Sequence, residues 1–181
     1  MSTRWTSFSE DWQEEVGCVA VDSPDGLLHF DPLDAPSTAD HTFITVFFHA
    51  RNAGGRVWAP TRLVQRLANR GVEVTDPFEP GDPLPGGVEC FETARDGEVV
   101  YWVPDERALV VGDVLLGAGA KPRPTEEPLR LCPERWLGKR THDDLRASLR
   151  PLLELPVEQI LVSHGAPVVR HATTVLVTLV S

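Results

Sequence analysis

The chain has 181 residues, of which 41% are hydrophobic, enough for the core of one domain spanning residues 1–181. Its 17 Lys and Arg against 27 Asp and Glu give a formal net charge of −10, so this acidic protein is not expected to bind nucleic acid or a membrane surface. No apolar run approaches the roughly 20 residues of a membrane helix, and the N-terminus lacks the apolar core of a signal peptide. Three cysteines without a CxxC pair exclude a disulfide framework and a cysteine zinc ribbon, so we expect a cytoplasmic protein.

Short elements separated by frequent Gly and Pro are predicted for the first half of the chain. Apolar runs around a Pro-Asp-Gly turn predict a hairpin, and a β-branched, apolar run predicts a buried strand. Pro at the start and Gly at the end delimit a predicted helix. In chain order these elements are a hairpin of 17–22 and 27–31, strands at 42–48 and 57–59, a helix at 60–70, a strand at 72–74 and a loop at 76–87.

The second half contains the clearest hairpin, in which apolar runs at 99–103 and 108–111 flank a Pro-Asp-Glu-Arg turn. A loop at 117–128 follows, and then a helix that begins with a capping box at Thr141 and is interrupted by Pro151. A strand is predicted at 160–163. Six of the ten residues of 172–181 are Thr or Val, which favours a strand for this tail.

Three polar side chains follow predicted buried strands: His49, Asp113 and His164. Strand ends that meet at one sheet edge are where layered α/β proteins place their sites, and imidazole and carboxylate are common metal ligands. Each residue alone is more typical of a packed or turn-forming position. The three together are a candidate metal-binding or catalytic group.

The order of four blocks resembles the metallo-β-lactamase superfamily over most of the chain. The blocks are Phe30-Asp31-Pro32 after the first hairpin, the strand with its following loop His49-Ala-Arg-Asn-Ala-Gly-Gly55, the strand ending in Gly112-Asp113, and the closing strand ending in His164-Gly165. The resemblance implies an α/β (α+β) fold, a four-layer αββα sandwich with a two-zinc site between the sheet edges. It also implies hydrolysis by a metal-activated hydroxide, with Asp113 as the bridging carboxylate and His164 as the closing histidine.

The central metal motif of that superfamily, HxHxDHxGG, is degenerate in this chain. Aligned on the glycines, the motif keeps His49 but has Arg51 for the aspartate, Asn52 for the next histidine and Phe47 for the first. Aligned on the strand end instead, His49 falls on a spacer position and no ligand survives in the motif. The histidine expected in the turn before the main hairpin is also replaced, by Ala94 or Arg95.

The remaining candidate pocket residues are His49, Arg51, Asn52, Asp113 and His164. A guanidinium cannot ligate a metal, so we expect Arg51 to pair with Asp113 or a neighbouring carboxylate and to fill the vacated pocket. This predicts a vestigial two-zinc site without cofactor, in a protein that binds a small molecule or a protein partner rather than performing two-zinc hydrolysis. The alternative is a hydrolase with one zinc ion on His49, Asp113 and His164, and a purely structural interaction module also remains open.

The predicted sandwich is trimmed. The helix that follows the metal loop in the resembled family is missing between Gly55 and Val57, and little room is left between Pro32 and Phe43. The missing helix would leave apolar surface on the outer sheet, so a protein partner or a homodimer is expected to cover it.

Overall fold

The computed structural model describes residues 2–10, 12–34, 38–47, 49 and 53–181, and it contains two main β-sheets. The larger sheet has six strands in sequence order, of which the first three are antiparallel and β3 to β6 run parallel. Its strands are β1 Ser2–Ser9, β2 Glu14–Ser23, β3 Gly26–Phe30, β4 His41–Phe43, β5 Arg56–Pro60 and β6 Asp76–Phe78.

The second sheet has four strands in the order β12-β9-β8-β7, in which only β9 and β12 are parallel. Its strands are β7 Glu89–Glu92, β8 Val99–Val103, β9 Ala108–Val111 and β12 Gln159–Val162. A separate antiparallel pair consists of β10 Leu115–Gly117 and β11 Leu129–Leu131.

Three α-helices and five 3₁₀ turns complete the described part of the chain. The α-helices are α1 Val64–Ala68, α2 His142–Leu149 and α3 Ala172–Val180. The 3₁₀ turns are η1 Thr61–Leu63, η2 Pro85–Gly87, η3 Pro104–Glu106, η4 Glu134–Leu137 and η5 Arg150–Glu154. None of the helices in the described ranges is long and apolar enough to cross a membrane.

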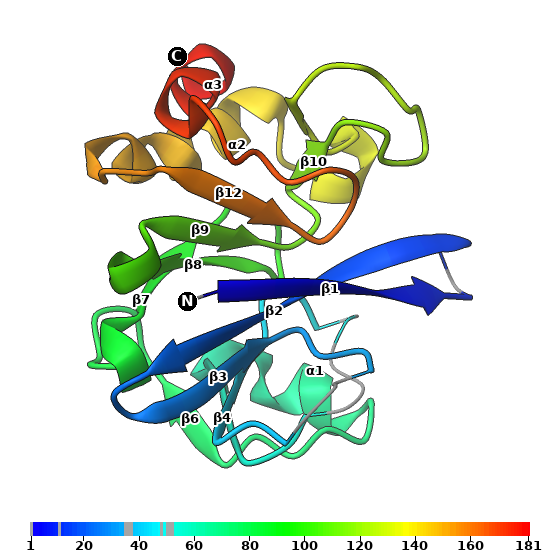
Figure 1. Cartoon of the computed structure of the whole chain (residues 1–181). Helices are drawn as coiled ribbons and strands as arrows, with labels where there is room; N and C mark the ends of the chain where they lie inside the picture. The colour runs from blue at the N-terminus through cyan, green and yellow to red at the C-terminus, as the bar shows by residue number, and fades with distance from the viewer. Residues whose placement is uncertain (1, 11, 35–37, 48, 50–52) are drawn as a thin grey trace.

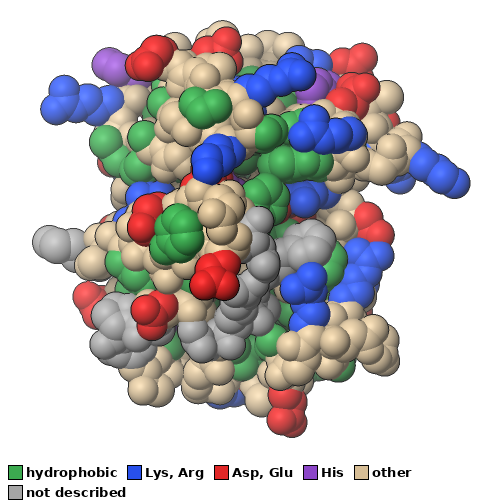
Figure 2. Space-filling view, turned by 90° about the vertical axis from the view of Figure 1, so that its right-hand side faces the viewer, with side chains coloured by type: hydrophobic (Ala, Val, Ile, Leu, Met, Phe, Trp, Pro, Cys, Tyr) green, Lys and Arg blue, Asp and Glu red, His purple; other side chains and the backbone are tan. Residues whose placement is uncertain are grey.

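The two sheets pack face to face, with helices on their outer faces (Figure 1). Between the sheets, Phe30 and Phe43 of the larger sheet contact Tyr101 of β8, with ring centroids 5.6 and 5.3 Å from its ring. A second core lies between the four-stranded sheet and helices α2 and α3, and a third lies between the six-stranded sheet and α1. The elements therefore stack as helices, sheet, sheet and helix. On the face of the molecule shown in Figure 2, basic and acidic side chains are interspersed.

Both predicted hairpins are confirmed as β2–β3 and β8–β9, and the capping box of α2 is present, with Thr141 and Asp144 bonding reciprocally. The strand predicted at 42–48 is wrong in length, because β4 ends at Phe43. Beyond Phe43 the chain leaves the sheet, and the Thr45 N–H donates a hydrogen bond to the carboxylate of Asp31 at 2.8 Å. The strand expected at 72–74 is wrong, because the strand in this region is β6, which occupies the beginning of the loop predicted at 76–87. Strand β1 is not predicted from the sequence.

The expected apolar gap on the outer face of the six-stranded sheet is covered. Ile44, Val57 and Ala59 are buried there against Leu63 and Leu67, which belong to η1 and α1. The segment after β5 thus covers this face in place of the missing helix. A homodimer remains a prediction.

The strand favoured for the tail is wrong, because residues 172–180 form α3. Ala172, Leu176 and Val180 recur every four residues and are buried in the core shared with α2. Helical spacing of three buried apolar residues outweighs the β-propensity of the intervening Thr and Val, which face outward or are half-buried.

We predict that Leu176→Ala lowers the free energy of unfolding by about 2–5 kcal/mol, because it leaves a cavity under α3. The matched control is Val177→Ala on the same helix, where the side chain is 41% exposed and the loss should stay below about 0.5 kcal/mol. Urea unfolding followed by circular dichroism measures both changes. Equal effects of the two substitutions would contradict the packing described for α3.

Candidate metal centre

Asp113 and His164, which follow strands, and His49, which lies in the segment after β4, come together in a group here called the His–Asp–His cluster. Asp113 follows β9 after one glycine, and His164 follows its parallel neighbour β12 after one serine. His49 lies beyond β4, where its N–H donates to the Val46 carbonyl at 3.0 Å. The structure thus brings the three residues together, although His49 lies six residues beyond the end of β4 and not directly after a strand as expected.

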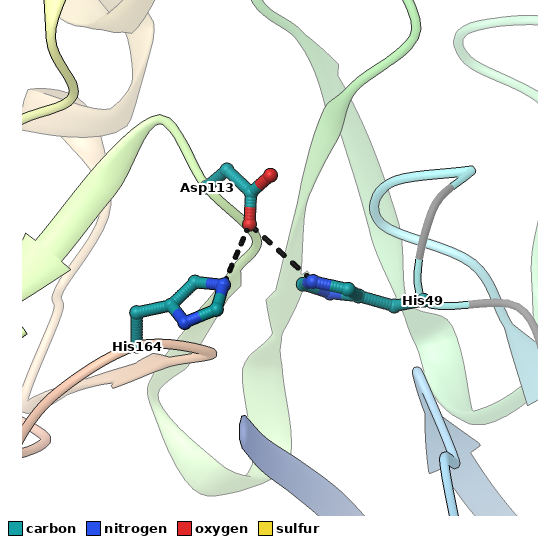
Figure 3. A group of neighbouring side chains, drawn as sticks. All are labelled: His49, Asp113 and His164. Atoms are coloured by element: carbon teal, nitrogen blue, oxygen red, sulfur yellow. Dashed lines mark ion pairs between the residues drawn. The ribbon is translucent and has the colours of Figure 1, made fainter. Parts of the chain in front are cut away.

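The three side chains point at one another (Figure 3). The Oδ1 atom of Asp113 lies 3.0 Å from Nε2 of His164 and 3.4 Å from Nε2 of His49. One ligand atom from each residue lies within 4.8 Å of the others, and at most 1% of each residue is exposed. This is the arrangement of three donors around a shared position.

The facing atoms of the cluster have no hydrogen-bond partner outside the cluster in the described part of the chain. They are Nε2 of His49, Nε2 of His164 and Oδ1 of Asp113. Buried polar atoms without partners are costly, at about 1–3 kcal/mol each. Three such atoms around one point fit a bound cation, because coordination would satisfy all three at once.

Carboxylates stand behind both imidazoles. Nδ1 of His164 lies 2.6 Å from Oε1 of Glu14 at the start of β2, and Nδ1 of His49 lies 3.5 Å from Oδ2 of Asp31. Asp31 is fixed after β3 in a left-handed conformation with φ 48° and accepts hydrogen bonds from Thr45. A carboxylate behind each imidazole directs the Nε2 lone pair toward the centre, as in metal-ligating histidines.

The second oxygen of Asp113 belongs to a buried ion-pair network. Nη1 of Arg95 lies 2.7 Å from Oδ2 of Asp113 and 2.7 Å from Oε2 of Glu98. The other oxygen of Glu98 accepts the Val114 N–H at 2.8 Å. Gly112 is required beside this network, because a Cβ there would lie 2.8 Å from Glu98 Oε1 and 2.9 Å from Thr45 Oγ1.

Two tryptophans flank the network and the cluster. The Trp12 ring, from the turn between β1 and β2, lies 4.7 Å from the His164 ring. The Trp136 ring lies 5.3 Å from Trp12, and the guanidinium of Arg95 lies over it at 5.4 Å. These rings limit the access of water to His164 and Arg95, which strengthens the electrostatic interactions around them.

The charges of the cluster shift the acidities of its members. Burial opposes the ionisation of Asp113, but His49, His164 and Arg95 together hold the pKa of Asp113 well below its usual range. Burial also opposes the charging of His164, yet Asp113 and Glu14 outweigh it and raise the pKa of His164 to about 9. Burial raises the pKa of Glu98, although Arg95 opposes this shift. Without a metal, His164 is therefore protonated at neutral pH.

Of the five predicted pocket residues, His49, Asp113 and His164 come together, while Arg51 and Asn52 lie outside the described residues. The contribution of His49 to the cluster supports the alignment on Gly54 and Gly55. The predicted ion pair of Arg51 stays a prediction, and the guanidinium that pairs with Asp113 in the described ranges is that of Arg95. Arg95 was noted only as the replacement of a ligand histidine.

The residues behind the cluster were missed by sequence reasoning, namely Glu14, Glu98 and the role of Asp31. Glu98 carried a signal, since a lone carboxylate directly before the apolar strand β8 has to be paired or exposed. Glu14 carried none, because an acidic residue at the start of a strand is typical of exposed positions.

No protein-family model matches the chain, and no curated protein matches it either. Solved structures of metallo-β-lactamases do match. The metallo-β-lactamase IND-7 is 13% identical to this chain with a TM-score of 0.69, and the match covers 99% of this chain and 92% of IND-7. TMB-1 is 15% identical with a TM-score of 0.68, and the match covers 99% of this chain and 91% of TMB-1. FIM-1 from Pseudomonas aeruginosa, in its mono-zinc form, is 13% identical with a TM-score of 0.64 over 99% and 89%.

These similarities define the architecture: the chain has the metallo-β-lactamase fold. The expected α/β class and the resemblance stated from the four sequence blocks are confirmed.

We predict that Arg95→Met lowers the free energy of unfolding by about 3–5 kcal/mol, because it leaves Asp113 and Glu98 buried without their cation. The control Arg66→Met removes an exposed pair with Asp96 and should cost less than about 1 kcal/mol. Chemical denaturation measures both variants.

A second variant separates charge from packing. In the Arg95→Met background, Glu98→Gln should recover part of the lost stability, because one buried negative charge is removed. A further loss would show that the cost comes from packing and would contradict the electrostatic account.

Proposed function

We propose that this protein binds one divalent metal ion of the zinc type through His49, Asp113 and His164 and acts as a single-metal hydrolase. The convergence of one buried ligand atom from each of these three residues carries the proposal. Two imidazole nitrogens and one carboxylate oxygen are a typical catalytic zinc ligand set. A zinc ion held by three protein ligands supplies an activated water and a Lewis acid for hydrolysis.

The chain's own residues prepare the cluster for a cation. Glu14 accepts the Nδ1 proton of His164, and Asp31 faces Nδ1 of His49, so each Nε2 can present a lone pair. Arg95 neutralises Glu98 and the outer oxygen of Asp113, which leaves Oδ1 as the ligand atom. Trp12 lies against His164 and excludes water from its ring.

One metal ion fits this set better than two. The guanidinium of Arg95 already pairs with Asp113, and its positive charge opposes a second dication on the same carboxylate. Mono-zinc FIM-1 has the same fold, which supports a one-metal state as compatible with this architecture. The proposal therefore agrees with the degenerate motif, which predicts that this chain no longer holds two zinc ions.

A metal-free binding protein is the second candidate function, with a small molecule or protein as its ligand. It is favoured by Arg95 together with His164, whose pKa is raised to about 9, because the two cations can balance Asp113 and Glu14 without a metal. In this case the cluster is vestigial.

Metal analysis of the purified protein distinguishes the two candidates. We predict about one zinc ion per chain after exposure to zinc and dialysis. His49→Asn and His164→Asn should each lower the zinc affinity at least tenfold, since an amide replaces an imidazole ligand. The control is His171→Asn, at an exposed left-handed position that Asn tolerates.

Two results would overturn the single-metal proposal. Protein that takes up no zinc, with the three variants indistinguishable from wild type, would favour the metal-free candidate. Binding of close to two zinc ions would show that the second metal position survives.

A further inference from the structure

A cavity of about 520 Å³ lies beside the buried Arg95–Asp113 pair. It is open to solvent and is bounded by the turn after β7, by Arg62 of η1 and by the segment that follows η4. Its lining residues are Arg62, Glu92, Thr93, Ala94, Arg95, Asp96, Leu137, Gly138, Lys139 and Arg140. The volume is in the range of small-molecule sites.

The lining of this cavity is positively charged in a chain whose formal net charge is −10. Four of its side chains are basic and two are acidic. Glu92 is paired with Arg62 and Asp96 with Arg66, so the carboxylates are already engaged. Lys139 and Arg140 are exposed, and neither forms an ion pair in the described part of the chain.

Arg95, whose side chain is 9% exposed, is among the residues that line the cavity. Its Nη1 atom donates to both Glu98 and Asp113. Within the described ranges, its Nε and Nη2 groups donate no hydrogen bond, although a guanidinium carries donors on all three nitrogens. Because Arg95 lines the cavity, an acceptor bound there can use these remaining donors.

The walls around Arg95 are held in place by hydrogen bonds. Arg62 donates from Nε to Glu92 at 3.0 Å and from Nη2 to the Glu98 carbonyl at 3.3 Å. The Ala94 N–H donates to Oγ of Ser148 on α2 at 3.0 Å. A guanidinium fixed in this way loses little entropy when it binds an anion.

We propose that this cavity binds the phosphate group of a small phosphate monoester. Arg62 and Arg95 are already engaged with carboxylates, so Lys139 and Arg140 are the two lining cations without an ion pair in the described ranges, and together they match the charge of a phosphate dianion near neutral pH. Arginine forks suit the oxygens of a phosphate, and Lys139 adds a point charge at the rim. The cavity is a ligand site of its own, so the inference goes beyond the proposed metal function and does not require it.

The test is a calorimetric titration of the full chain with inorganic phosphate at low ionic strength. The double variant Lys139→Ala/Arg140→Ala should weaken phosphate binding at least tenfold, because it removes two rim cations without touching Arg95. The control Arg123→Ala/Arg170→Ala removes two exposed basic residues outside the cavity and should change the affinity less than twofold. Succinate, a dianion of different shape, should bind at least tenfold more weakly than phosphate.

The same titration on His164→Asn separates this proposal from the metal proposal. Retained phosphate affinity in that variant supports the cavity, whether or not the wild type holds a metal. If His164→Asn loses phosphate binding and the Lys139/Arg140 double variant keeps it, the anion binds at the metal centre and the inference is overturned. No phosphate binding by the wild type, equal effects of the two double variants, or equal affinity for succinate would also overturn it.

Discussion

The carboxylate of Asp113 is fully buried, and the surrounding residues have to compensate for its negative charge. Its two oxygens are divided between two environments: Arg95 pairs with Oδ2, and His49 and His164 face Oδ1. Since a lone buried carboxylate is strongly destabilising, both environments have to form for this edge of the sandwich to fold. We infer that Arg95 always supplies the positive charge at Oδ2, whereas either protonated His164 or a metal ion supplies the positive charge at Oδ1.

The fold meets this requirement with few elements. The parallel pair β9 and β12 ends in Asp113 and His164, and the chain beyond β4 returns through Thr45 to carry His49 to the same edge. Glu14 begins β2, whose backbone contacts the end of β12 through the Gly17 N–H and the Ser163 carbonyl at 2.7 Å. The second carboxylate behind the cluster, Asp31, lies at the end of β3. Asp113 and His164 are thus positioned by sheet pairing, whereas His49 is positioned by the segment between β4 and β5.

Sequence patterns were sufficient for the parts of this arrangement that depend on local chemistry. Both hairpins and the capping box followed from turn residues and periodicity, and the positions of Asp113 and His164 after β9 and β12 followed from the apolar runs before them. The Arg95–Glu98–Asp113 network did not, because its pairing links the turn before β8 to the end of β9, and only tertiary packing buries them together. The tail was mispredicted for a similar reason, since burial of Leu176 against α2 outweighs local β-propensity.

An anomalous diffraction measurement at the zinc absorption edge tests the central claim most directly, on crystals grown with excess zinc. The account predicts one strong peak between Nε2 of His49, Oδ1 of Asp113 and Nε2 of His164, with the guanidinium of Arg95 still on Oδ2. A second peak displacing Arg95 from Asp113, or no peak between the three side chains, would contradict it.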